Sequence, residues 1–562
     1  MKSRWYKDAV VYQIYPRSFC DSNGDGIGDL RGIISKLDYI KELGVNAVWL
    51  SPIYKSPNDD NGYDISNYRD IMDEFGTMAD FDEMLEGMHA RGIKLIMDLV
   101  ANHTSDEHEW FVQSRSSKDN PYRDYYIWRK GRGKNGKKPP NNWTSRFGGS
   151  AWQYDEKTGE WYLHLFSRKQ PDLNWENPAV RKEIADICNF WMDKGVDGFR
   201  CDVITYISKE KGLPDGKFNP IMCGDEHFVV GPRYHEFIHE LNKNSWSKYD
   251  SYTVGESAGI TFEKAPDCIA EDREELDTIF GFEHMCTDMY MEVIPHKFKL
   301  SRFTKVLSKW QTLPEGCWNT LFLENHDQPR SLGRFTGDFG ENRYEAATML
   351  AVAMQLLKGT PFVYQGQEIG MVNCKFRDED YLDVMARQVF SIARKIPFGK
   401  AIARACLAKR ARDHARTPMQ WNAGENAGFT AGKPWMMLNP SYKTINVEND
   451  LNAGDKSVYD FYKRLHAFRR GNEIVGCGDY VQLDPANDKV FGYTRNYGGK
   501  TLLVVANFKN KNVRYSLPAE LAKGKVLLSN YKDSRLSPVL ELRPYEAVSY
   551  THLRAHETLS DG

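Results

Sequence analysis

Acidic side chains stand at the ends of several short apolar runs that are typical of buried parallel strands. These acids are Asp98 in LIMDLV, Asp202 in GFRCD, Glu256 in VGES and Asp327 in ENHD. A single acid at a strand end commonly serves as a helix N-cap or as half of a salt bridge. Several at one end of a barrel repel one another, which costs stability unless the charges are used. The pattern therefore predicts a catalytic site built from carboxylates.

The neighbours of these acids suggest a division of labour. Arg200 lies two residues before Asp202, so in a strand both side chains point the same way, and the guanidinium favours an ionised, nucleophilic Asp202. Glu256 has no basic neighbour in the sequence, and a carboxyl in apolar surroundings keeps its proton, as a general acid must. One ionised and one protonated carboxyl are the equipment of glycoside hydrolysis. Asp327 would hold sugar hydroxyls and stabilise the developing positive charge.

A recurring alternation of strands and helices must position these residues. Helical apolar spacing separates most of the β-rich runs, for example over 33–43 and 81–90. Eight strand–helix units predict an α/β fold, a (β/α)8 TIM barrel with its active site at the carboxyl ends of the strands. The predicted strands are 9–15, 47–50, 94–100, 196–200, 252–255, 277–281, 320–323 and 362–364.

Insertions and a change of pattern divide the chain further. The barrel is predicted to occupy 1–103 and 173–479, with an inserted domain B at 104–172, after strand three. A second insertion, 370–450, follows strand eight. From 480 to 548, period-two runs separated by turns predict a C-terminal antiparallel β-sandwich domain. Residues 549–562 break this pattern, and we interpret them as a non-native tail.

Composition excludes several classes of function. The 75 basic and 77 acidic side chains among 562 residues give a net charge of −2, which argues against nucleic acid or anionic membrane partners. No apolar run approaches the roughly 18 residues that span a bilayer, and the N-terminus lacks a signal segment. The ten Cys form no C-x-x-C motif and are typical of buried thiols in a reducing compartment. We expect a cytoplasmic monomer without organic cofactor that acts on a small neutral oligosaccharide.

An ordered set of motifs resembles one enzyme superfamily. DLVANH, GFRCD, TVGES and ENHDQPR occur in this order, with QPDLNWENP between the first two. Over about residues 5–547 the chain resembles the α-amylase superfamily (glycoside hydrolase family 13), close to its oligo-1,6-glucosidase or isomaltase group. The resemblance implies a retaining double displacement with Asp202 as nucleophile, Glu256 as acid/base and Asp327 as transition-state stabiliser. The two catalytic carboxyls of such enzymes lie about 5–5.5 Å apart.

The resemblance also implies a set of substrate-binding residues. Those expected to line the pocket for the non-reducing glucose are Tyr63, Asp64, His103, Arg200 and His326, with Phe166 and Gln170 near its rim and Arg416 closing it. Val203, directly after the nucleophile, resembles enzymes that prefer α-1,6 bonds, although a β-branched residue here could simply pack.

These features predict an exo-acting α-glucosidase for the α-1,6 bonds of isomaltose, panose and isomalto-oligosaccharides. Hydrolysis of α-1,4 bonds or sucrose, transglycosylation and sucrose isomerisation stay open as alternatives, because the same site serves them. The Arg-rich loop of the isomerases is absent from 291–320. A non-catalytic barrel, like the transporter heavy chains that resemble this superfamily, is disfavoured because all three catalytic carboxylates are present.

The segment DSNGDGIGD, residues 21–29, places oxygen donors at alternate positions between glycine turns, a pattern that suits a hard cation. An EF-hand is excluded because Gly32 stands at the twelfth position, where that loop needs Glu. The resemblance implies a structural Ca²⁺ site formed by the side chains of Asp21, Asn23, Asp25 and Asp29 and the carbonyl of Ile27. An acidic turn without an ion is the alternative.

The run HEFIH, residues 235–239, matches the zinc-protease motif H-E-x-x-H. Its apolar neighbours Tyr234, Phe237, Ile238 and Leu241 instead predict an amphipathic helix on the outside of the barrel. We expect no zinc catalysis from it.

Overall fold

Eight parallel strands form the centre of the protein, whose computed structural model describes residues 4–219, 222–290 and 294–553. They form one sheet in the order β11-β10-β9-β5-β2-β1-β15-β14. Where the first and last of these strands meet, the Thr320 hydroxyl donates to the carbonyl of Ile279 at 2.9 Å. The predicted (β/α)8 barrel is confirmed. Its strands are β1 (Val11–Ile14), β2 (Ala47–Leu50), β5 (Lys94–Val100), β9 (Gly198–Asp202), β10 (Tyr252–Glu256), β11 (Thr278–Phe280), β14 (Thr320–Leu321) and β15 (Thr360–Tyr364).

Helices cover the outside of the barrel, and local sequence signals fix several of their ends. Thr77 and Asp80 form a capping box at the start of α3 (Met78–Ala90). The helix predicted over 33–43 is split into α1 (Leu30–Ile34) and α2 (Leu37–Glu42). Between them the Ser35 hydroxyl donates to the carbonyl of Gly32 at 2.7 Å, a local bond that competes with helix continuation. Other barrel helices are α5 (Pro178–Asp193), α6 (Tyr234–Asn244), α7 (Pro266–Ile269), α8 (Leu300–Trp310), α9 (Ser331–Thr336), α10 (Arg343–Gln355) and α15 (Val458–Arg469).

The H-E-x-x-H motif lies on α6. His235 Nδ1 is 2.8 Å from a carboxylate oxygen of Glu275, and His239 Nδ1 is 3.2 Å from the carbonyl of Arg273. Across the described residues, no three His, Cys, Asp or Glu side chains form a group that could hold a metal ion. The motif therefore belongs to an ordinary barrel helix.

Two insertions rise beside the carboxyl ends of the barrel strands. The first holds α4 (Glu109–Ser116) and an antiparallel sheet of β6 (Trp128–Arg129), β8 (Glu160–Leu163) and β7 (Trp152–Asp155). The second holds α11 (Val384–Ala393), α12 (Gly399–Arg410), α13 (Asp413–Arg416) and α14 (Val447–Leu451). A short hairpin of β3 (Tyr54–Lys55) and β4 (Asn67–Ile71) adds the loop that carries Asp60 and Tyr63.

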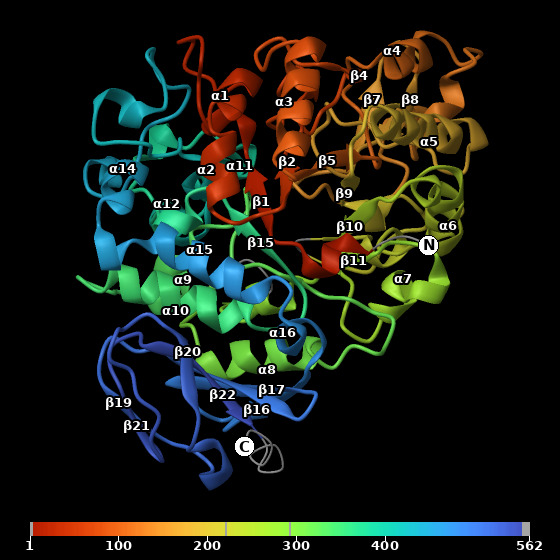
Figure 1. Ribbon diagram of the computed structural model, residues 1–562. Helices are drawn as coiled ribbons and strands as arrows, with labels where there is room; N and C mark the ends of the chain where they lie inside the picture. The colour runs from red at the N-terminus through yellow and green to blue at the C-terminus, as the bar shows by residue number, and fades with distance from the viewer. Residues whose placement is uncertain (1–3, 220–221, 291–293, 554–562) are drawn as a thin grey trace.

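The C-terminal domain is made of two antiparallel sheets. The larger contains β16 (Asp479–Leu483), β17 (Val490–Tyr497), β18 (Lys500–Asn507), β22 (Ala547–Leu553) and β20 (Lys525–Ser529), and the smaller contains β19 (Val513–Ser516) and β21 (Val539–Leu542). The larger sheet lies against α8 and α10 of the barrel (Figure 1). At this contact the Tyr493 hydroxyl donates to the carbonyl of Ala353 at 3.3 Å.

The last strand continues beyond the boundary predicted at 548. Ser549 pairs with Val504 and Tyr550 with Leu503, and both Ser549 and Tyr550 are buried. The strand ends at Leu553, so residues 549–553 belong to the sheet, whereas 554–562 lie outside the described residues. None of the described helices is long and apolar enough to cross a membrane.

Candidate active site

Arg200 joins three carboxylates at the carboxyl ends of neighbouring strands. Its Nη1 lies 2.7 Å from Asp98 Oδ1 and 2.6 Å from Asp202 Oδ1, and its Nη2 lies 2.6 Å from Glu256 Oε2. Strand register accounts for part of this, because Asp98 on β5 is paired with Arg200 on β9. Two carboxylates held by adjacent nitrogens of one guanidinium lie close together, which favours the short spacing of a retaining glycosidase over the longer spacing of an inverting one.

This sharing corrects the expectation that Arg200 serves Asp202 alone and that Glu256 has apolar surroundings. Burial raises the pKa of Asp98 and of Asp202, and repulsion between the carboxylates adds to both shifts. Arg200 opposes the shifts, but one guanidinium balances only one of three negative charges. Arg200 therefore compensates only part of the negative charge gathered at these strand ends.

Asp327 lies beside a second charged group, formed with Arg412, Arg416 and Asp383. Its Oδ1 is 2.6 Å from Arg416 Nη2 and 3.3 Å from Arg412 Nη1, and both arginines also reach Asp383 Oδ2 at 2.7 Å. Burial acts to raise the pKa of Asp327, but the surrounding positive charges outweigh it and hold the pKa well below its usual range. Asp327 is therefore an anion at neutral pH, unlike the acids that share Arg200.

This placement changes the role expected of Arg416. The side chain is 2 % exposed, and its Nε also donates to the carbonyl of His326 at 3.1 Å. It therefore holds Asp327 in place, a role in addition to the predicted closing of the pocket. Arg412, which sequence reasoning missed, is more exposed, at 13 %, and its guanidinium lies over the ring of Phe147 at 5.7 Å. Arg412 precedes Arg416 by four residues at the start of α13, and this helical spacing could have predicted that the two arginines lie side by side.

His326 and Tyr63 stack in the floor of the site, with ring centroids 5.3 Å apart and planes inclined by 8°. The Tyr63 hydroxyl lies 2.8 Å from His326 Nε2 and donates to Asp98 Oδ2 at 3.2 Å. Gln13 Nε2 lies 2.8 Å from the other ring nitrogen of His326. Burial lowers the pKa of His326 to about 3, so the ring is neutral and acts as a hydrogen-bonding group.

The loop between β3 and β4 brings in Asp60 in place of the predicted Asp64. Both oxygens of Asp64 accept backbone N–H groups, from Asp59 at 2.8 Å and from Asp60 at 3.0 Å, so this buried carboxylate shapes the turn. Asp60 Oδ1 instead lies 3.4 Å from Arg412 Nη2. Burial raises the pKa of Asp60 to about 7, although Arg412 opposes the shift. Asp60 stood in the run NDDNGYD, only three residues before Tyr63, but no local pattern distinguished it from Asp64.

Gln170 is fully buried and not at the rim as predicted. Its amide nitrogen donates to Asp60 Oδ2 at 3.2 Å and lies 3.2 Å from His103 Nε2. Burial lowers the pKa of His103 to about 4, so this ring is also neutral. Phe166 is more exposed; its ring centroid lies 5.1 Å from that of His103 and 6.0 Å from that of Tyr206, on which it stacks. Gln170, His103 and Phe166 thus form one connected group, of which Phe166 is the most exposed.

Val203 has a backbone conformation that β-branched residues rarely adopt. It lies directly after Asp202 with φ of +35°, in the left-handed region. Its backbone N–H donates to Glu256 Oε2 at 3.2 Å, and its side chain is buried. The strained turn therefore links the two strand ends that carry Asp202 and Glu256.

The loop of residues 21–29 contains three successive side-chain turns. Asp21 accepts from the N–H of Asn23 at 2.9 Å, Asn23 from Asp25 at 2.8 Å, and Asp25 from Ile27 at 2.8 Å. Asp29 instead caps α1 through Gly32 N. The donor set is all oxygen, as Ca²⁺ requires, but the loop's carboxylates alone do not form a metal-binding group among the described residues, so Asn23 and the Ile27 carbonyl would have to complete it.

The ion pairs of Asp383 with Arg412 and Arg416 should contribute to the free energy of unfolding in a pH-dependent way. Arg412 and Arg416 lower the pKa of buried Asp383 against the effect of burial. A carboxyl whose folded pKa is depressed stabilises the fold above its unfolded pKa of about 3.9, and the contribution is lost as pH falls through the folded value. Asp383→Asn should cost about 3 kcal/mol at pH 7, and the difference from wild type should narrow toward pH 3 in urea titrations.

The half-buried surface pair of Asp378 with Arg404 supplies the matched control. Asp378→Asn should cost less than about 1 kcal/mol at either pH. A pH-independent loss in Asp383→Asn would contradict the electrostatic interpretation.

The fold and the site together define a class of enzyme. A (β/α)8 barrel with three carboxylates on one guanidinium, a further acid in the loop after β14 and a C-terminal β domain is the architecture of a glycoside hydrolase. Residues 13–478 match the family described as alpha amylase, catalytic domain, and residues 490–548 match the alpha-amylase SusG C-terminal domain. The chain belongs to the alpha-amylase family.

Relatives cover almost the whole chain. It is 53 % identical to an oligo-1,6-glucosidase of Parageobacillus thermoglucosidasius over 98 % of this chain and 99 % of the relative, and 50 % identical to one of Bacillus cereus over 98 % and 100 %. Among solved structures, trehalose-6-phosphate hydrolase of Bacillus licheniformis has a TM-score of 0.92 at 46 % identity, over 98 % of this chain and 100 % of that one. An isomaltulose synthase of Erwinia rhapontici has a TM-score of 0.93 at 43 % identity, over 97 % and 99 %.

Proposed function

We propose that the protein is a retaining, exo-acting α-glucosidase that hydrolyses α-1,6 bonds at the non-reducing ends of isomaltose, panose and short isomalto-oligosaccharides. The observation that carries the chemistry is the sharing of Arg200 by Asp202 and Glu256. Relatives named oligo-1,6-glucosidase at about half identity over their full length support the choice of bond. A neutral oligosaccharide also needs no steering field, which agrees with the net charge of −2.

In this mechanism Asp202 attacks the anomeric carbon while Glu256 gives its proton to the departing glycosidic oxygen. Glu256 then takes a proton from water, which displaces Asp202 and restores the original anomeric configuration. Asp327, held anionic by Arg412 and Arg416, binds sugar hydroxyls and opposes the positive charge of the oxocarbenium-like transition state.

We infer exo action from a buried polar cluster, Asp60, Gln170 and His103, that contacts the backbone of Tyr63. Gln170 donates to Asp60 and lies within hydrogen-bonding distance of His103, and all three side chains are buried. Their acceptors and donors suit the hydroxyls of a terminal glucose, whereas a chain continuing past this sugar would have to displace them. The rings of Phe166 and Phe147 lie edge to face with centroids 5.7 Å apart, and both side chains are partly exposed.

The proposed bond preference is tested by initial rates on isomaltose, panose, maltose, sucrose, trehalose and trehalose 6-phosphate. We expect isomaltose and panose to give the highest kcat/KM, with release of α-glucose as the first product seen by NMR. A higher value on sucrose, maltose or trehalose 6-phosphate would contradict the α-1,6 assignment. Release of β-glucose would contradict retention.

Val203 offers a test of how the pocket selects the bond. Val203→Thr exchanges a methyl for a hydroxyl at a buried position beside the nucleophile. We expect the ratio of maltose to isomaltose kcat/KM to rise roughly tenfold, within the range of a methyl-sized change in a binding pocket. Val203→Ile keeps the apolar surface and is the control. If the ratio of maltose to isomaltose kcat/KM is the same in both variants, Val203 does not determine which bond is selected.

We also propose that the enzyme is a cytoplasmic monomer.

We further propose that the loop of residues 21–29 holds a structural Ca²⁺. The ion would be held by Asp21, Asn23, Asp25, Asp29 and the Ile27 carbonyl, and it takes no part in the chemistry. Treatment with EGTA should lower Tm, and added Ca²⁺ should restore it. The Asp25→Ala variant should have a lower Tm than wild type, and EGTA should not lower it further. If EGTA leaves the Tm of the wild-type protein unchanged, the proposed site is contradicted.

A further inference from the structure

The helical hairpin of α11 and α12 concentrates positive charge on one segment of a nearly neutral protein. Between Asp383 and Asp413 the chain contains no acidic residue, and we call this segment, 384–412, the basic hairpin. Its eight basic residues are Arg387, Arg394, Lys395, Lys400, Arg404, Lys409, Arg410 and Arg412. Net charge averages over the whole chain and hides this segment.

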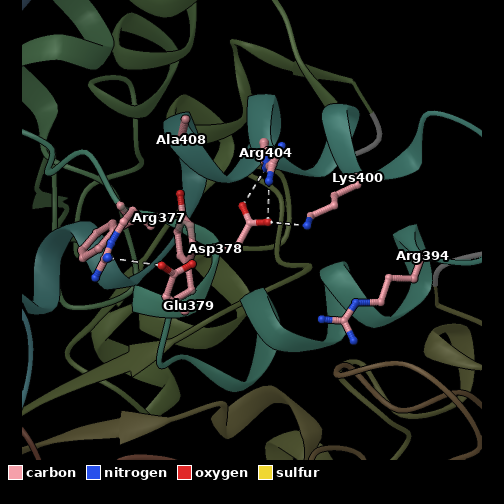
Figure 2. Close-up of a pocket in the computed structure, with 9 residues that line it drawn as sticks. Arg377, Asp378, Glu379, Arg394, Lys400, Arg404 and Ala408 are labelled. Carbon is pink, nitrogen blue, oxygen red and sulfur yellow. Dashed lines mark hydrogen bonds and ion pairs between the residues drawn. The ribbon is translucent and has the colours of Figure 1, made fainter.

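The basic hairpin is an ordered unit with a small core of its own. Phe390 of α11 and Leu407 of α12 belong to a hydrophobic cluster separate from that of the barrel, together with alanines of both helices. Asp378, in the segment that precedes the hairpin, lies 3.0 Å from Lys400 Nζ and 2.7 Å from Arg404 Nε (Figure 2). The hollow of about 820 Å³ at this place is lined by Asp378 and Glu379 as well as by basic side chains, so we do not assign it as an anion site.

Other cations of the hairpin are directed elsewhere. Arg412 belongs to the active site, and Arg410 pairs with Asp288. Arg387, Arg394 and Lys395 are exposed and have no ion pair among the described residues. Figure 2 shows the Arg394 side chain extending from α11 into the hollow that Asp378 also lines, without an ion pair to it. These groups are available to an external anion.

Large apolar side chains stand exposed around the turn that joins the two helices. Phe398 is 87 % exposed, and Ile402, Ile396 and Ile392 are 60 %, 54 % and 47 % exposed. Ile392 lies in the last turn of α11, Ile396 and Phe398 lie in the connecting turn, and Ile402 lies in the first turn of α12. Exposed groups of this size, side by side with unpaired cations, are typical of segments that lie in a membrane interface.

We propose that the basic hairpin docks the enzyme on an anionic lipid bilayer. Phe398 and the three isoleucines would enter the headgroup region, while Arg394, Lys395 and Arg387 would contact lipid phosphates. A second copy of the chain is disfavoured, because a two-fold contact would oppose two equally basic hairpins. An acidic protein would form ion pairs with the cations, but it would not bury the apolar side chains that protrude from the turn. The proposal departs from the expectation, based on net charge, that no membrane is involved.

Vesicle flotation with the full-length enzyme tests the proposal. Vesicles of equal parts phosphatidylglycerol and phosphatidylcholine should carry the enzyme upward at low salt, and 0.5 M NaCl should release it. Pure phosphatidylcholine vesicles should bind at least about tenfold less. Equal binding to both vesicles, or no binding to either, would overturn the proposal, as would retention on an acidic polymer such as polyglutamate without any flotation.

Paired variants separate the two contributions to docking. Arg394→Glu with Lys395→Glu, and Phe398→Ser with Ile402→Ser, should each lower vesicle binding at least about tenfold and leave the hydrolysis of p-nitrophenyl α-glucoside unchanged. The matched controls are Lys523→Glu with Lys525→Glu and the exposed helical Leu451→Ser, which should bind as wild type does. Hairpin variants that bind like these controls would contradict the proposal, and so would salt-sensitive dimerisation that the hairpin variants abolish.

Discussion

Asp202→Ala should reduce hydrolysis of isomaltose and of p-nitrophenyl α-glucoside by at least about 10⁴-fold, the scale of losing a group on which the whole catalytic unit depends. Asp202 is one of three carboxylates on Arg200, and in the proposed mechanism it is the one that bonds to the anomeric carbon. Without it no covalent intermediate forms, so both the attack and the hydrolysis step are lost. Steady-state rates measure the loss directly.

Chemical rescue makes this prediction specific to a nucleophile. Azide fits the space that the Asp202 side chain leaves, attacks from the same face and should give β-glucosyl azide from an activated α-glucoside. The control is Glu236→Ala, which removes the carboxylate of the formal zinc motif on α6 and should leave turnover unchanged. Full activity in Asp202→Ala, or rescue that yields the α-azide, would contradict the assignment of Asp202.

Glu256→Gln should produce a second large loss that depends on the leaving group. For isomaltose, whose leaving oxygen needs a proton, kcat/KM should fall about 10²–10⁴-fold, the usual contribution of general acid catalysis. For α-glucosyl fluoride, whose leaving group needs no proton, the first step should be far less affected. Gln keeps the hydrogen-bonding shape toward Arg200 and the Val203 N–H, so the comparison isolates the proton.

Azide should again identify the role, with the opposite stereochemical outcome. In Glu256→Gln the glucosyl–Asp202 intermediate still forms, and azide replaces the water that can no longer be activated. The product should therefore be α-glucosyl azide. An equal loss on isomaltose and on the fluoride would show that Glu256 positions the substrate and does not supply the proton.

Local sequence was sufficient to predict the strands and the acids that end them. Buried strands such as β2 and β5 read as apolar runs because both their faces are covered, and their predicted bounds, 47–50 and 94–100, match the structure. The shared direction of Arg200 and Asp202 followed from the two-residue period of one strand. The family motifs suggested roles for these residues, but they did not predict which residues contact one another.

Only the tertiary structure showed which carboxylates form ion pairs with the same arginine. Closure of the barrel places Asp98 and Glu256 on the Arg200 that the sequence assigned to Asp202 alone. It also pairs Asp60 with Arg412, which is 352 residues away in the chain. Because neither residue has a local pattern that reveals its partner, the family resemblance was assigned to Asp64, and Arg412 was missed. The continuation of β22 past 548 could not be predicted for the same reason, since the pairing of Ser549 with Val504 depends on a neighbour distant in sequence. Strand periodicity acts over a few residues and can be read along the chain, whereas hydrogen bonds, burial and the balance of charge depend on elements that meet only after folding.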